Sequence, residues 1–209
     1  MAPILDLPFM KKPKDEVHTS QPEPPTAQED QQLKLKLYKI IIDRYREQIE
    51  SYETKTVSEL KTMVAPYDKK IEEIKETITS NFHPYIFSEH FLEAAQMAFS
   101  YVRSFQTISP PVSFWLSFQE MHSLLAGDEI DKSILLCSIL RSLGCEKAKV
   151  VVTDDRSSFV VFEFDGKSFL ASHSEKELKE FRSEKEAFSA MPGKPLYAFN
   201  DKVYEDFAE

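Results

Sequence analysis

Residues 127–174 read GDEIDKSILLCSILRSLGCEKAKVVVTDDRSSFVVFEFDGKSFLASHS, and this stretch decides the fold that the sequence predicts. Asp128 follows a glycine and is expected to cap a helix by accepting a free backbone N–H of the first turn. The helix that follows is apolar on nearly every face, so we expect other elements to cover it on most sides. Gly144 supplies the left-handed residue that ends it. A buried helix is therefore predicted at the centre of the domain.

Three short runs rich in β-branched and aromatic residues follow this helix, at residues 150–153, 158–164 and 167–172. The last two runs are joined by Asp165-Gly166, a strong signal for a two-residue hairpin turn. The predicted fold class is therefore α+β, with the buried central helix packed on a small antiparallel sheet.

The order of helix, strand and hairpin, with Gly127-Asp128 opening the helix and residues 140–144 (LRSLG) closing it, resembles a known fold. It is similar to the transglutaminase-like domain of the papain-type cysteine peptidase superfamily. The resemblance covers residues 110–173. It implies a catalytic Cys at the helix start, a His that opens the middle strand and an Asp that ends the next strand.

All three catalytic positions that the resemblance implies are substituted, because they fall on Glu129, Phe159 and Ser172. A two-residue turn at Asp165-Gly166 places Phe159 directly opposite Ser172, which is where a His–Asp pair would lie. Acyl transfer of this kind needs a thiolate, a base and a group that orients the base. We therefore expect a divergent member that lacks the triad; the substitutions favour a protein that is not an enzyme but leave this open.

The functional prediction is a catalytically inactive transglutaminase-like module that acts as an interaction protein and binds a protein or peptide. The alternative is a hydrolase of the peptidase or amidase type, with relocated catalytic groups around Glu129 and His173. Strand alternation points His173 to the face opposite that of Ser172. Cys137 lies two turns along the helix and Cys145 beyond its end, so neither replaces the missing nucleophile.

Candidate residues of a binding cleft surround the start of the central helix. They are Trp115, His122, Asp128, Glu129, Phe159, Ser172 and His173. Acidic residues in the first turn of a helix are stabilised by the positive end of the helix dipole, which explains their presence without a bound ion. No metal site is therefore predicted there. The sequence contains no motif that predicts a cofactor.

Composition narrows the classes of partner. The chain has 209 residues and a formal net charge of −9, without the Lys/Arg clustering that a nucleic-acid surface shows, so no nucleic-acid partner is expected. No apolar run reaches the ~18 residues of a membrane span, and the start lacks the order of a secretion signal. The two cysteines form neither a disulfide framework nor a metal motif. A cytoplasmic protein with no membrane partner is predicted.

Three regions are predicted along the chain. Residues 1–31 are rich in Pro, Gln and Glu and are expected to form a disordered tail. Residues 32–80 are helical and charged, with a stripe at Leu37, Ile41, Tyr45, Ile49 and Tyr52 and then a coiled-coil-like seam at Leu60, Val64, Tyr67, Ile71, Ile74 and Ile78. Residues 81–209 form the α+β domain.

The helical region has two interpretations that the sequence leaves open. It could form a hairpin packed on the core domain, or an arm that binds a partner or a second copy through the helices of residues 33–79. Thr56 and Glu59 form a capping box that predicts a break near residue 55, and Pro66 predicts a kink or a new helix start. Beyond the hairpin, residues 174–188 are expected to be helical and residues 196–199 to form the last strand.

Overall fold

The computed structural model describes residues 27–207. By its internal contacts the chain divides into two compact units, Met1–Arg44 and Tyr45–Glu209. The predicted disordered tail lies outside the described residues as far as residue 26. Helix α1 (Ala27–Glu53) then begins within the stretch predicted as tail, and it runs through the boundary between the two units.

The second unit is built around α6 (Glu129–Ser142), the buried helix that the sequence predicts. Its Asp128 cap accepts a hydrogen bond from the backbone N–H of Asp131, and Gly144 takes a φ of +106° just beyond its end. Leu136, Ile139 and Leu140 of α6 are fully buried. The prediction of a central helix covered on most sides is confirmed.

A six-stranded antiparallel sheet packs on α6, with strand order β6-β5-β4-β3-β7-β8. The strands are β3 (Lys149–Thr153), β4 (Ser158–Phe164), β5 (Lys167–Ala171), β6 (Lys179–Phe181), β7 (Pro195–Phe199) and β8 (Tyr204–Asp206). Two-residue strands β1 (Gln106–Thr107) and β2 (Ala126–Gly127) form a separate parallel pair. The fold is thus a mixture of helix and sheet, as the predicted α+β class requires.

The hairpin of β4 and β5 has the register that the sequence predicts. Phe164 pairs with Lys167, and Val160 pairs with Ala171. Asp165 and Gly166 both adopt positive φ, at 50° and 71°, which is the conformation that a two-residue type I′ turn requires. The turn chemistry therefore fixes the pairing of the two strands.

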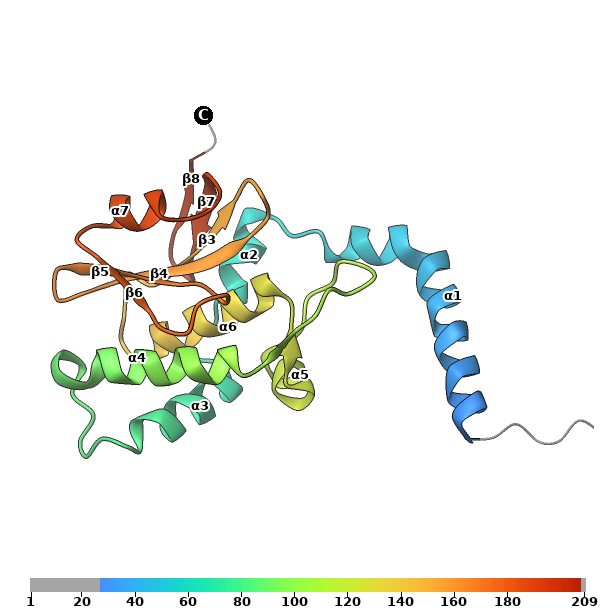
Figure 1. Ribbon diagram of the computed structural model, residues 1–209, viewed down its shortest axis with the longest axis horizontal. Helices are drawn as coiled ribbons and strands as arrows, with labels where there is room; N and C mark the ends of the chain where they lie inside the picture. Colours follow the sequence, from blue (N-terminus) through green and yellow to red (C-terminus); the bar gives the residue numbers. More distant parts are fainter. Residues whose placement is uncertain (1–26, 208–209) are drawn as a thin grey trace, which may run out of the picture. The chain divides into compact units, whose positions relative to one another are not determined.

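The layers of the second unit are visible in Figure 1, where α6 lies between the sheet and the helices α3 (Lys69–Thr79) and α4 (Phe87–Arg103). One large apolar cluster joins these helices to the sheet and includes Ile71, Phe91, Phe99 and Phe162. Helix α7 (Glu184–Ser189) covers the other face of the sheet over a smaller cluster. The sheet is therefore covered on both faces near β4.

The region between α1 and α4 breaks where the sequence predicts. Helix α2 (Val57–Met63) starts with the capping box of Thr56 and Glu59, and α3 starts with Asp68 as its cap, shortly after the buried Pro66. Tyr67 is 85% exposed, whereas Ile71, Ile74 and Ile78 are buried. The predicted seam is thus divided between two helices, and its α3 part packs within the second unit on α6.

The segment after the hairpin differs from the predicted helix. It contains strand β6 at the edge of the sheet and only then the short helix α7. A further strand, β8, follows the one predicted as the last. Within residues 27–207 we find no helix with the length and apolar character needed to cross a lipid bilayer.

Candidate functional site

The start of α6 meets the first residue of β4 and the segment after β5, and this meeting point defines the candidate site. Alternate residues of β4 and β5 point to opposite faces of the sheet. Val160 and Ala171 belong to the large cluster that contains α6. Phe159 and Leu170 belong to the small cluster under α7.

The predicted triad positions therefore do not all face the central helix, and this corrects the sequence interpretation. Phe159 is 5% exposed and lies in the cluster on the α7 side, so its side chain points away from α6. Continuing the register one step beyond the pair of Phe159 and Ser172 places Ser158 opposite His173 on the face toward α6. Strand alternation correctly predicted that His173 and Ser172 point to opposite faces of the sheet. The sequence interpretation nevertheless placed Ser172 on the face toward α6 and His173 on the other, which is the reverse of the observed arrangement.

Three side chains from separate elements close a hydrogen-bonded cluster at this point. The Ser133 Oγ of α6 shares hydrogen bonds with the Ser158 Oγ at 3.0 Å and with the His173 Nε2 at 2.9 Å. Ser133 has no exposed surface, and Ser158 is 3% exposed. We call Ser133, Ser158 and His173 the hydroxyl–imidazole cluster.

The imidazole of this cluster is held neutral. Burial, together with the charge of Lys132, lowers the pKa of His173 to about 4, against the opposing effect of the Glu129 backbone. Among the side-chain polar atoms of residues 27–207, the His173 Nδ1 is buried with no hydrogen-bond partner. No carboxylate therefore orients this ring.

A cavity of about 370 Å³ opens beside the cluster, at the ends of β4 and β5. It brings together four of the residues that the sequence singled out, Glu129, Phe159, Ser172 and His173. The Ser172 Oγ shares a hydrogen bond of 2.9 Å with the Ser174 Oγ. We call this the α7-side cavity, because Ala190 and Pro192 after α7 complete its wall.

A second cavity of about 570 Å³ lies on the other side of the helix start and holds two more of the predicted residues, Trp115 and Asp128. The Trp115 indole Nε1 donates a hydrogen bond of 2.8 Å to the backbone carbonyl of Glu53. Ser158 lines both cavities, so they adjoin at the hydroxyl–imidazole cluster. We call this second space the Trp115 cavity.

His122 is not part of the site. It lies on α5 (Phe118–Leu124), hydrogen-bonds through Nδ1 to the Tyr101 hydroxyl at 2.8 Å, and lines a different cavity of about 430 Å³. That cavity is walled by Ile74, Ile78 and Met97 of α3 and α4. The structure thus separates His122 from the six other predicted cleft residues.

The carboxylates at the helix start are partly buried. Burial, together with the neighbouring charge of Asp128, raises the pKa of Asp131 to about 7. Burial also raises the pKa of Asp128. In the part of the chain that the structure describes, no three His, Cys, Asp or Glu side chains come together as metal ligands would.

The two thiols offer no nucleophile to either cavity. Cys137 and Cys145 are both buried and free. Burial raises the pKa of Cys137 far above its usual range and that of Cys145 to about 11. A thiolate is the reactive form of cysteine, so neither side chain is chemically poised.

Sequence reasoning missed Ser133 and Ser158. Both faces of the sheet are covered here, and residues 158–162 are all buried, so no alternation of polar and apolar residues indicates which face points to α6. Ser133 stands in a helix with almost no polar side, where a small hydroxyl gives no signal. Its spacing of four residues after Glu129 places both on one helical face, which is the one available clue.

These features define an α+β protein in which a buried helix begins at a polar cluster between two cavities. No protein-family model matches the chain. No curated protein matches its sequence. The comparison with solved structures gives partial likenesses, among them to three forms of one bacterial protein.

The chain is similar to LapG of Legionella pneumophila, with 16% identity over 66% of this chain and 87% of that one, at a TM-score of 0.46. The calcium-bound and EGTA-treated forms of LapG each give 15% identity and a TM-score of 0.45, with 66% of this chain covered and 88% and 85% of theirs. Such low values leave both family and function to be argued from the chain's own residues.

Proposed function

We propose that this protein is a transglutaminase-like module without acyl-transfer chemistry, which binds a polypeptide in the groove formed by the α7-side cavity and the Trp115 cavity. The single observation that supports this proposal is the hydroxyl–imidazole cluster. It occupies the meeting point of helix and hairpin, where the family resemblance implies a catalytic triad, and its hydroxyls and imidazole are bonded to one another.

The cluster lacks the features of an acyl-transfer site. Such chemistry needs an accessible nucleophile, a base beside it and a group that orients the base. Ser133 has no exposed surface, so a substrate carbonyl has no path to its oxygen. The His173 Nδ1 has no hydrogen-bond partner among the described residues, so no side chain there orients the imidazole as a base.

The groove has the dimensions and chemistry that suit a polypeptide. Its two cavities, of about 370 and 570 Å³, adjoin at Ser158 and so extend past the start of α6 on both sides. Apolar walls at Phe159 and Leu170 alternate with hydroxyls and charged groups, among them Glu129 and Lys179. Pockets that mix apolar lining with a few polar groups are the usual form of a specific site.

The binding role is tested with a phage library of random peptides selected on the full chain. The protein contains a single tryptophan, and Trp115 lines the groove, so its fluorescence reports occupancy. Lys179→Glu in the α7-side cavity should weaken a selected peptide, whereas Lys202→Glu, at an exposed lysine remote from the groove, should not. Peptides that bind with no change in Trp115 fluorescence and no effect of Lys179→Glu would contradict the proposal.

The second candidate function is a hydrolase in which Ser133 is the nucleophile and His173 the base. The bond of 2.9 Å between them favours it, as does an imidazole that is neutral near pH 7. A fluorophosphonate probe separates the two functions, because it labels only a serine that a base activates. We expect no labelling of the wild type; labelling that disappears in Ser133→Ala and in His173→Gln would establish the hydrolase instead.

A further inference from the structure

Helices α3, α4 and α5 together enclose the cavity of about 430 Å³ that His122 lines. From α3 it takes Glu73 and Thr77, four residues apart, and Ile74 and Ile78 beside them, so one face of that helix forms a wall. Among the described residues, none lines both this cavity and either cavity of the groove. We call it the three-helix pocket, and its volume falls in the range of ~300–1,000 Å³ that is usual for small-molecule sites.

The body of the three-helix pocket is apolar. Ile74 and Ile78 are 7% and 5% exposed, and they belong to the large apolar cluster. Met97 of α4 lines the pocket with them and packs against the same cluster. A methionine side chain is unbranched and adapts to the shape of what it contacts. This part of the pocket therefore suits an apolar ring or chain.

Two pairs of polar side chains lie close together on the pocket lining. The Tyr101 hydroxyl shares a hydrogen bond of 2.8 Å with the His122 Nδ1, and Lys70 forms an ion pair with Glu73. The hydrogen bond from Lys70 holds the pKa of Glu73 below its usual range, and His122 is near enough to act in the same direction. The polar groups thus gather at one end, where the charges of Lys70 and Glu73 already compensate each other.

The pair of Tyr101 and His122 retains one hydrogen-bond donor that no other described residue uses. Burial raises the pKa of Tyr101, so the phenol keeps its proton at neutral pH. A neutral imidazole has one N–H donor and one acceptor nitrogen. If Tyr101 donates to Nδ1, the N–H at Nε2 of His122 remains; if Nδ1 donates, the Tyr101 O–H remains. Either tautomer therefore offers a donor to a ligand.

We propose that the three-helix pocket binds a small uncharged amphipathic molecule that has an apolar body and a carbonyl head. The body lies against Ile74, Ile78 and Met97, and the carbonyl oxygen accepts the remaining donor of the pair of Tyr101 and His122. An anionic head is disfavoured because the Glu73 carboxylate lies at the same end. A cationic head accepts no hydrogen bond and would leave that donor unused.

Prodan, a neutral aminonaphthalene with a propionyl carbonyl and polarity-sensitive fluorescence, tests the site on the full chain. Its emission should shift to the blue and saturate at one molecule per chain. Thr77→Trp should abolish binding by filling the pocket mouth at an exposed position. Glu72→Trp is the matched control and should bind as the wild type does, because Glu72 is exposed about 140° around α3 from Thr77. No saturable binding by the wild type, or equal binding by Thr77→Trp, would overturn the proposal.

A second variant tests the head group while keeping the apolar lining. Tyr101→Phe combined with His122→Phe removes both possible donors and should weaken prodan binding about 2- to 10-fold, the effect of one net hydrogen bond. Anilinonaphthalene sulfonate has a similar body but an anionic head, so it should bind the wild type more weakly than prodan does. Unchanged prodan affinity in the double variant, or tighter binding of the sulfonate, would overturn the assigned ligand class.

Methyl NMR of the wild type locates the probe without any substitution. The methyl resonances of Ile74 and Met97 should shift when prodan is added, whereas those of Ile130, which lines the Trp115 cavity, should not. Shifts at Ile130 without shifts at Met97 would place the probe in the groove and refute a site between α3, α4 and α5.

Discussion

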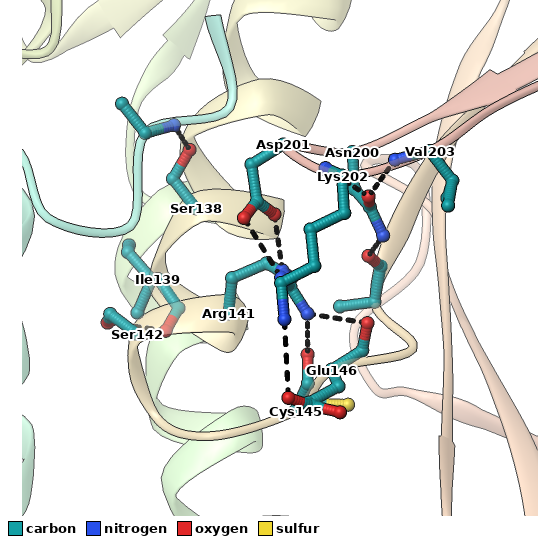
Figure 2. Close-up of polar contacts among 12 residues, drawn as sticks. Ser138, Ile139, Arg141, Ser142, Cys145, Glu146, Asn200, Asp201, Lys202 and Val203 are labelled. Atoms are coloured by element: carbon teal, nitrogen blue, oxygen red, sulfur yellow. Dashed lines mark hydrogen bonds and ion pairs between the residues drawn. The ribbon is translucent and has the colours of Figure 1, made fainter. Parts of the chain in front are cut away.

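The ion pair of Arg141 and Asp201 allows a quantitative test of how α6 is held to the sheet. Arg141 lies in the last turn of α6, and its side chain is only 5% exposed. Its Nε and NH2 donate hydrogen bonds of 2.5 and 2.9 Å to the two carboxylate oxygens of Asp201, in the turn between β7 and β8 (Figure 2). Its NH1 also donates to the backbone carbonyl of Glu146 at 2.5 Å. One guanidinium thus joins the helix end to the edge of the sheet.

Replacing Asp201 with Asn keeps the shape but removes the charge that balances Arg141. Breaking a buried ion pair on one side costs about 3–5 kcal/mol, because the other charge stays buried without its partner. The Asp201 side chain is 19% exposed, so water offsets part of this cost, and we expect about 3 kcal/mol. For a chain of this length that loss lowers the Tm by about 6–12 °C.

A double-mutant cycle that includes Arg141→Met separates the coupling energy of the ion pair from the contributions of its two side chains. Apolar replacement of both members of a buried pair is often nearly neutral. Arg141→Met with Asp201→Leu should therefore cost less than the sum of the two single changes, with a coupling of about 1–3 kcal/mol. Urea unfolding followed by far-UV circular dichroism measures the free energy of unfolding of the two single variants, Arg141→Met and Asp201→Leu, and of the double variant. A loss below ~1 kcal/mol for Asp201→Asn, or additive costs in the cycle, would refute the reasoning.

Two further predictions concern the core and the pH dependence of stability. Leu136→Ala should cost about 2–5 kcal/mol in urea unfolding, because the side chain is fully buried in the centre of α6; an unchanged midpoint would contradict the central position of this helix. Burial holds the pKa of Asp131 at about 7, above its unfolded value, so its contribution to stability is present below about pH 4 and is lost as pH rises to about 7. Asp131→Asn should remove this slope from unfolding curves measured across that window, and an unaltered slope would contradict it.

The central helix and the hairpin could be predicted because each is specified by local chemistry. An apolar helix with a capping residue and a terminal glycine has one way to be stable, which is to be buried. Asp165 and Gly166 specify a turn whose length also fixes the register of β4 against β5. These features depend on neighbouring residues, so the sequence displays them.

The strands beyond the hairpin could not be predicted in the same way. Residues 174–188 are rich in charge, and charged residues are favourable in exposed helices. Strand β6 nevertheless forms at Lys179–Phe181 because it pairs with the edge of the sheet at β5. Such pairing depends on a surface built by distant residues, and local propensity does not report it.

The meeting of the helix start with the hairpin could be predicted, but not which residues face it, since the face of a strand cannot be read where both faces are buried. Position 159 illustrates the difficulty. The register that pairs Phe159 with Ser172 is correct, but only the packing of Phe159 beneath α7 shows which way the pair points. The polar residues that do meet α6 are Ser158 and His173, one step further along the same register.

This assignment makes a direct prediction about thiol chemistry at the helix start. Introducing Cys, His and Asp at positions 129, 159 and 172 should create no activated thiol, because a histidine at position 159 would point to the α7 side of the sheet.

Ser133→Cys should create one. It places the sulfur where the Ser133 Oγ lies 2.9 Å from the His173 Nε2, and a neighbouring imidazole stabilises the thiolate by taking its proton. The pH dependence of thiolate absorbance in the ultraviolet, which needs no reagent to reach this buried position, should therefore give a lower thiol pKa in Ser133→Cys than in Ser133→Cys with His173→Gln. Equal thiol pKa values in these two variants, or an activated thiol in the triple substitution at positions 129, 159 and 172, would show that the site lies on the α7 side of the sheet instead.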